Sequence, residues 1–129
     1  MESELRAALI EWLRADAVLA GLLNAVTEEA PVCAASPWLA IAASASGDWS
    51  TKDRMGREVR VAFELHCPGD DPGTAVAVTR AIEQRIEALP RVQAGFAVAT
   101  IVFLRARAEQ RPGNRRAVLL EYRFRVLAD

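Results

Sequence analysis

The sequence contains few of the residues on which most enzyme chemistry depends. It has one histidine and two cysteines, a single lysine among its sixteen basic residues, and only 6% aromatic residues. A mechanism that needs a histidine base would therefore have to use His66. Cys33 and Cys67 lie far apart and form no CxxC spacing, so we predict two buried free thiols rather than a structural disulfide.

Several recognisable motifs are also missing. No apolar run reaches the roughly 18 residues of a membrane-spanning helix. The seven glycines form neither GxGxxG nor GxxxxGKS, and no serine lies in a GxSxG elbow. The N-terminal "MESELRAALIEWLRAD" is acidic and amphipathic, unlike a secretory signal. We therefore expect a chain that is made and assembled in the cytoplasm, with no membrane partner.

The composition that remains is that of an ordinary globular domain. The 129 residues are 52% hydrophobic and 26% charged, which predicts one domain over residues 1–129 with its own core. The net charge is −1, but residues 1–30 hold six acids against two arginines, and residues 105–125 hold seven arginines against two glutamates. This polarity indicates either oppositely charged surfaces that meet between neighbouring molecules or the solvated faces of amphipathic elements.

Apolar periodicity predicts three helices. Helical spacing covers residues 2–15, and Asp16 is positioned to cap a short helix that ends near Asn24. A long helix opens at Asp71 and Pro72 and stops at Pro90. Residues 25–37 show no period and are predicted to be a connecting loop. The expected buried positions of the first and last helices are Leu5, Leu9, Trp12, Leu13, Val78, Ile82, Ile86 and Leu89.

Alternating apolar residues predict four strands, at about 38–45, 57–67, 96–108 and 117–127. The order of elements gives two hairpins separated by the long helix. We therefore predict an α+β fold, in which a four-stranded, mainly antiparallel sheet carries the N-terminal helix and the long helix on one face.

The candidate catalytic and metal-binding groups do not form a credible site. His66 and Cys67 are consecutive in a strand, so their side chains point to opposite faces and cannot act as a pair. A metal set drawn from His66, Cys67, Asp70 and Asp71 mixes hard and soft ligands without a known spacing. We expect no catalytic residue, metal or cofactor. The rival interpretation is a small ligand-binding module or enzyme with a deep pocket that converges on His66 or Cys67.

The surface is better suited to partners than to catalysis. Trp49 lies in the polar loop "SGDWSTKDRMG", where it is either a lid on the core or an interface anchor. The tip "RPGNRR" is basic enough to touch phosphates, which keeps nucleic-acid binding as a third interpretation. The strand segment "VATIVF" is apolar on both faces, which favours a protein contact. The residues expected at such contacts are Asp48, Trp49, Thr51, Lys52, Arg111, Arg115 and Arg116.

Five segments of the sequence follow one another in a recognisable order: "LRAALIEWLRADAVLAGLL", "PWLAIA", "GDWSTKDRMGREVRVAFELHC", "AVAVTRAIEQRIEAL" and "RAVLLEYRFRVLAD". Through them, almost the whole chain resembles the tail-completion, or tail-terminator, proteins of long-tailed phages and gene transfer agents. The resemblance implies a non-enzymatic virion protein that forms a ring, typically a hexamer, at the head-proximal end of the tail tube. It further implies that the ring contacts the major tail tube protein and the head–tail connector, and that DNA passes through its lumen. In the family, the sheets of neighbouring subunits join around the ring.

Overall fold

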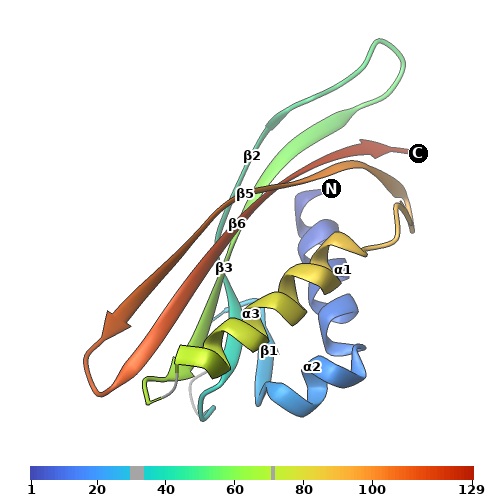
Figure 1. Ribbon diagram of the computed structural model, residues 1–129. Coiled ribbons are helices and arrows are strands. Elements are labelled where there is room, and N and C mark those ends of the chain that lie inside the picture. Colours follow the sequence, from blue (N-terminus) through green and yellow to red (C-terminus); the bar gives the residue numbers. More distant parts are fainter. Residues whose placement is uncertain (30–33, 71) are drawn as a thin grey trace.

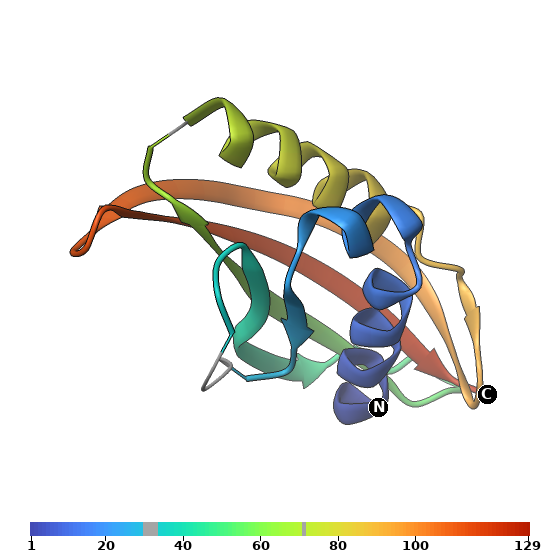
Figure 2. The same ribbon diagram turned by 90° about the horizontal axis from the view of Figure 1, so that it is seen from below.

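The computed structural model describes residues 1–29, 34–70 and 72–129. Three helices lie on one face of a curved sheet (Figures 1 and 2). The elements, in chain order, are α1 (Glu2–Arg14), α2 (Ala17–Leu22), β1 (Ala25–Thr27), β2 (Trp38–Asp48), β3 (Gly56–Pro68), α3 (Pro72–Glu87), β4 (Val92–Gln93), β5 (Phe96–Arg111) and β6 (Arg115–Ala128).

The sheet has six strands in the order β1-β2-β3-β6-β5-β4, which corrects the predicted four. The four long strands form two antiparallel hairpins, and β3 pairs with β6 to join them. The prediction of a loop over 25–37 was wrong at Ala25–Thr27, which pairs in parallel with β2. The two additional strands, β1 and β4, contain three and two residues, so neither is long enough to show the alternation that identifies a strand.

Most of the predicted element boundaries lie within a few residues of the observed ones. The amide of Leu19 donates to Asp16 Oδ2 over 3.1 Å, which confirms the predicted N-cap of α2. Helix α3 ends at Glu87, before Pro90. The predicted role of Asp71 at the start of this helix lies outside the described residues. None of the helices in the described part of the chain is long and apolar enough to cross a bilayer.

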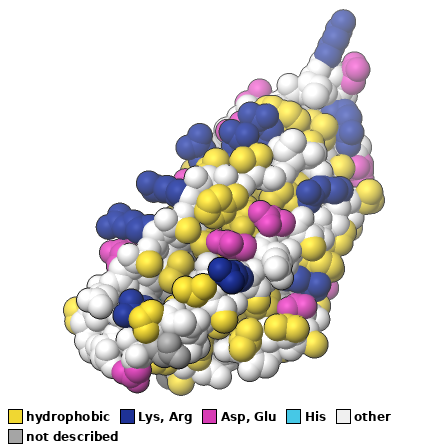
Figure 3. All heavy atoms as spheres, in the orientation of Figure 1, with side chains coloured by type: hydrophobic (Ala, Val, Ile, Leu, Met, Phe, Trp, Pro, Cys, Tyr) yellow, Lys and Arg dark blue, Asp and Glu magenta, His cyan; other side chains and the backbone are white. Residues whose placement is uncertain are grey.

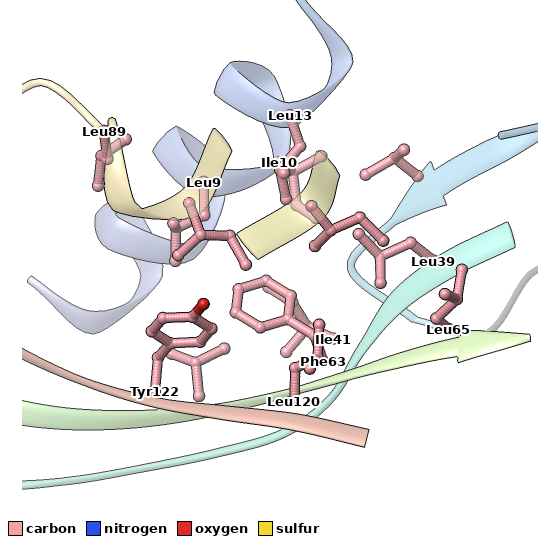
Figure 4. Packing of buried hydrophobic residues seen from close by; sticks show 14 of the residues in the cluster. Leu9, Ile10, Leu13, Leu39, Ile41, Phe63, Leu65, Leu89, Leu120 and Tyr122 are labelled. Atoms are coloured by element: carbon pink, nitrogen blue, oxygen red, sulfur yellow. The ribbon is translucent and has the colours of Figure 1, made fainter. Parts of the chain in front are cut away.

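The core lies between the helices and one face of the sheet (Figure 4). Tyr122 and Phe63 point from the strands towards the helices, and each buried aliphatic side chain around them contributes roughly 1.5–3 kcal/mol to folding. The predicted α3 residues Val78, Ile82 and Ile86 are buried, Leu89 is buried just beyond the end of the helix, and Trp12 of α1 is only half-buried. The buried helical residues that were predicted are Leu5, Leu9, Leu13, Val78, Ile82, Ile86 and Leu89.

The two hairpins extend past the helices in opposite directions (Figure 1). The β2–β3 turn lies at one end of the molecule and the β5–β6 turn lies at the other. Strands β2, β5 and β6 extend further into these hairpins than predicted, and the added hairpin residues are exposed or half-buried and show no apolar alternation. We call these two projecting hairpin ends, around the β2–β3 turn and the β5–β6 turn, the arms of the molecule. The three helices form the helical platform between them.

Candidate assembly surfaces

The β2–β3 turn is a hydrogen-bonded structure that is tied to the end of the last strand. Ser50 Oγ donates to Asp48 Oδ1 over 2.7 Å and accepts from the Gly56 amide over 3.1 Å. The Thr51 amide donates to the Arg54 carbonyl over 2.8 Å. Arg54 Nε in turn donates to the carbonyl of Ala128 over 2.7 Å. The turn therefore holds a defined shape, as a docking element requires.

Trp49 is half-buried and lies outside the core cluster formed by the described residues. The guanidinium carbon of Arg125 is 5.4 Å from the centre of its ring. Arg125 also donates from Nε to Glu58 Oε2 over 3.2 Å. The indole thus lies beside a charged pair on the sheet rather than over the core. Of the two roles predicted for Trp49, an interface anchor fits this position better than a core lid.

The β5–β6 turn brings the three predicted tip arginines together. Asn114 and Gly113 take positive φ values of 56° and 80°, which let the strands reverse tightly. Arg116 Nε donates to the Gly69 carbonyl over 3.3 Å, and Arg111 Nη2 lies 3.3 Å from Glu109 Oε1. Arg111, Arg115 and Arg116 line a recess of about 140 Å³ together with backbone and amide groups. This recess is a basic surface at the end of one arm.

The two predicted interface groups do not form one site. Asp48, Trp49, Thr51 and Lys52 lie at one end of the molecule, and the arginine tip lies at the other (Figure 1). They are therefore two separate candidate regions for contact.

The face of the sheet opposite the helices carries pairs of opposite charge. Arg105 Nε lies 2.8 Å from Glu121 Oε2 across β5 and β6, and Arg125 pairs with Glu58 across β6 and β3. Arg111 reaches Glu64 at 3.7 Å. Exposed pairs of this kind add little to stability. They do make the face polar, so it is a surface for water or charged partners rather than a second core.

His66 is already engaged within this face. Its ring stacks on Trp38 of the neighbouring strand, with centroids 4.0 Å apart and planes inclined by 13°. Its Nε2 lies 2.5 Å from Glu64 Oε1. The adjacent Cys67 is fully buried in the hydrophobic core, and burial raises the pKa of its thiol, which makes the reactive thiolate less available. The two side chains occupy different environments.

The described residues contain no group of three potential His, Cys, Asp or Glu ligands that could hold a metal ion. A groove of about 380 Å³ lies between α3 and the β5–β6 arm and is lined by neither His66 nor Cys67. A pocket that converges on these two residues was the expected mark of a ligand-binding module or enzyme. Cys33 lies outside the described residues.

The acidic N-terminal region is partly neutralised within the chain. Arg6 bridges Glu2 and Glu28 at 2.9 and 2.7 Å, and Asp16 lies 3.9 Å from Arg85. Hydrogen bonds from Ser46 and Ser44, together with Arg6, lower the pKa of Glu2. Glu11 remains exposed on α1. The charge available to a neighbour is therefore smaller than the sequence count indicated.

Among the described residues, both sides of the sheet have free strand edges, a feature that the sequence pattern did not reveal. Strand β4 pairs only with Phe96 and Ala97, so within the described chain the outer edge of β5 has no strand beside it over residues 99–111. On the other side, β1 pairs only with residues 38–40 and leaves residues 41–48 of β2 without an outer neighbour in the described part. Such edges expose backbone donors and acceptors that another strand can satisfy.

Two comparisons place this architecture among known proteins. The family model described as "Tail completion protein gp17" matches residues 7–127. The chain belongs to this family, and its class is that of a phage tail structural protein. The match confirms the family that the sequence resemblance indicated.

A solved structure gives a closer structural comparison. The chain is similar to a protein in the structure titled "Virion of native gene transfer agent (GTA) particle", with a TM-score of 0.84 and 26% sequence identity. The alignment covers 98% of this chain and 97% of the other. No curated protein sequence matches the chain significantly.

Proposed function

We propose that the chain is a tail terminator, which forms a closed ring at the head-proximal end of a phage-like tail tube. It acts through its shape, by capping the tube and presenting a surface to the head–tail connector, and performs no catalysis. Its membership of the tail completion family and its similarity to a protein of a gene transfer agent virion support this function. The particle is thus of phage or gene transfer agent type.

The observation that best supports a ring is the pair of free strand edges, on β2 and β5, at opposite sides of the described sheet. A contact between the β2 edge of one copy and the β5 edge of the next uses two different surfaces and is therefore heterologous. Repetition of that contact closes a ring when the rotation divides a full turn, and we propose six subunits. The sheets then form a continuous wall around a lumen through which DNA passes.

The two arms supply the remaining contacts in this proposal. The β2–β3 turn, with Asp48, Trp49, Thr51 and Lys52, and the arginine tip, with Arg111, Arg115 and Arg116, extend past the helices at opposite ends of the molecule. We assign them to contacts with neighbouring subunits, the major tail tube protein or the connector. The acidic α1 region of one subunit meets the arginine-rich arm of the next.

Tube assembly tests the function directly. Purified tail tube protein from the same particle is allowed to polymerise with increasing amounts of the chain, and tube lengths are measured by electron microscopy. A terminator produces shorter tubes as its molar ratio rises, because capped ends no longer grow. Unchanged tube lengths at a saturating concentration of the chain would exclude the proposal. A monomer in dilute solution would not exclude it, because the ring can require the tube as a template.

A further inference from the structure

The helical layer leaves part of its own face of the sheet uncovered. Helix α3 packs on β3 and β6, and the helix-side positions of β5 are buried at Phe96 and Val98 but exposed from Phe103 onwards. Phe103 is 43% exposed there, although the edge of its ring contacts Tyr122 with centroids 5.5 Å apart. Ala106 and Ala108 continue the same side of the strand and are also exposed. An apolar surface therefore follows β5 beside α3.

This surface deepens into the α3–β5 groove, defined here by Ala75, Val76, Thr79, Ala108 and Val118, which has a volume of about 380 Å³. Val76 is 51% exposed on its wall. In Figure 3, hydrophobic side chains on this view of the molecule lie between dark blue basic side chains and magenta acidic ones. The charged residues that line the groove are Arg80, Glu83, Glu109 and Arg116.

The groove is continuous with the free edge of β5. Ala108 and Glu109 belong both to the groove and to the strand segment without an outer neighbour in the described chain. A strand that pairs with this edge brings its own chain across the opening of the groove. The occupant is therefore whatever molecule pairs with β5.

We propose that a second copy of the chain fills the α3–β5 groove, with residues from the side of the molecule that carries its free β2 edge. This inference rests on the proposed ring, in which the β2 edge meets the β5 edge. The groove and the surface that fills it are different parts of the same chain. A copy whose groove is filled by one neighbour therefore still has its β2 side available for the groove of the next copy, and the ring can close. Lining charges of both signs suit a partner that also carries both.

A small apolar ligand is the competing occupant, because the volume falls within the range of small-molecule pockets. The position of the groove argues against a small-molecule ligand. The groove opens along an unpaired strand edge and beside the half-exposed Phe103, so a small molecule would leave both features exposed. A neighbouring subunit covers all of them at once.

The substitution Val76→Asp tests the groove, and Val18→Asp is its matched control. Both residues are exposed helical valines, 51% and 62% exposed, but Val18 lies on α2 outside the groove. We expect Val76→Asp to weaken association between subunits by about tenfold or more, because the contact would have to bury a charged group in place of an apolar side chain, even with Arg80 nearby on the same helix. Its melting temperature should match that of the wild type, and Val18→Asp should associate normally.

Mixing experiments separate the two surfaces of the contact. Val76→Asp copies retain an intact β2 side, so immobilised wild type should capture them, whereas immobilised Val76→Asp should not capture further Val76→Asp copies. Equal capture in both arrangements would overturn the proposal. Ring assembly by Val76→Asp at wild-type efficiency would overturn it as well, while leaving the proposed function intact.

A photoreactive amino acid at position 76 identifies the occupant. The experiment uses the conditions under which rings are seen on tube ends, with isotopically distinct copies to mark inter-chain products. The expected cross-link joins position 76 to the β2 side of another copy. Rings with no inter-chain product from position 76, or with products only to tube protein, contradict the inference alone. Failure to form rings at all contradicts the proposed function together with it.

Discussion

The guanidinium carbon of Arg85 lies 3.3 Å from the centre of the Trp12 ring, so that α3 contacts α1 through this stack. Two hydrogen bonds reinforce the stack. Trp12 Nε1 donates to the Arg85 carbonyl over 2.7 Å, and Arg85 Nε donates to the Trp12 carbonyl over 2.9 Å. Each residue thus presents its side chain to the backbone of the other. This reciprocal contact fixes the helical platform on which both arms are mounted.

We predict that Arg85→Ala lowers the free energy of unfolding by about 1–3 kcal/mol, because it removes the cation–π contact and the hydrogen bond from Arg85 Nε to the Trp12 carbonyl. Chemical denaturation followed by tryptophan fluorescence measures the loss. Arg85→Lys should recover only part of it, since an ammonium group cannot reproduce the planar stack. The exposed neighbour provides a control, as Gln84→Ala should change stability by less than about 0.5 kcal/mol. If Arg85→Ala changed the free energy of unfolding no more than Gln84→Ala does, the contact between Arg85 and Trp12 would not contribute to stability.

The base of the β2–β3 turn depends on the absence of a side chain at Gly56. A Cβ there would lie 2.4 Å from the Trp49 carbonyl oxygen and 2.9 Å from the Val126 carbonyl oxygen. Because both contacts are with backbone, Gly56→Ala should cost about 2–4 kcal/mol or displace the turn. Gly47→Ala in the same hairpin has no atom within 4 Å of the added carbon and should be well tolerated. Thermal unfolding of the two variants makes the comparison, and similar melting temperatures would refute it.

Tyr122 should make the protein less stable at alkaline pH. Burial, followed by the carboxylates of Glu87 and Glu83, raises the pKa of its phenol above the ordinary value of about 10. The unfolded chain releases this proton first, so the free energy of unfolding falls as the pH rises above about 10, by at most about 1.4 kcal/mol per pH unit. Tyr122→Phe should lose this component of the decline. Urea unfolding at pH 8 and pH 11 tests it, and parallel losses in both proteins would contradict the prediction.

Tyr122→Phe also tests whether the buried Tyr122 hydroxyl destabilises the core. The Tyr122 hydroxyl is buried and has no hydrogen-bond partner among the described residues. Removal of a buried unpaired hydroxyl is expected to be neutral or stabilising. At pH 8, Tyr122→Phe should therefore be at least as stable as the wild type. A loss above about 1 kcal/mol would indicate that the hydroxyl makes a stabilising interaction.

Charge reversal at the two arm ends should affect assembly without affecting folding. Lys52 and Arg115 are exposed, so Lys52→Glu and Arg115→Glu should each change stability by less than about 0.5 kcal/mol. Each should reduce capping of tail tubes or joining to the connector, because a partner surface that complements the basic side chain would no longer match the reversed charge. Arg91→Glu, at an exposed site outside both arms, is the control. Normal capping and joining by both arm variants would remove these residues from the proposed interface.

The parts of the fold that follow from local chemistry could be predicted from the sequence. The α3 stripe of Val78, Ile82 and Ile86 repeats with the helical period, and Asp16 carries the side-chain oxygen that a helix N-terminus requires. The strands β1 and β4 could not be found, since two or three residues show no period and owe their pairing to longer neighbours. The contact between Trp12 and Arg85 was hidden as well, because 73 positions separate its partners.

The candidate surfaces were predictable only in part. The composition of the β2–β3 turn and of the β5–β6 tip marked both as exposed polar segments, and the alternation of β3 correctly separated His66 from Cys67. The positions of the turns at opposite ends depend on the way in which β3 and β6 pair, which no local pattern encodes. The free edges and the α3–β5 groove likewise result from which strands lie at the margins of the sheet.

The most direct test of the account is to image tail tubes assembled with the chain. Cryo-electron microscopy of tube ends, with native mass spectrometry of the detached cap, gives the location and subunit number of the chain together. We predict a closed ring of six copies on one end of the tube only, with β2 of each copy beside β5 of the next. Single copies at the tube end, or a ring whose subunits touch through other surfaces while both strand edges remain free, would contradict it.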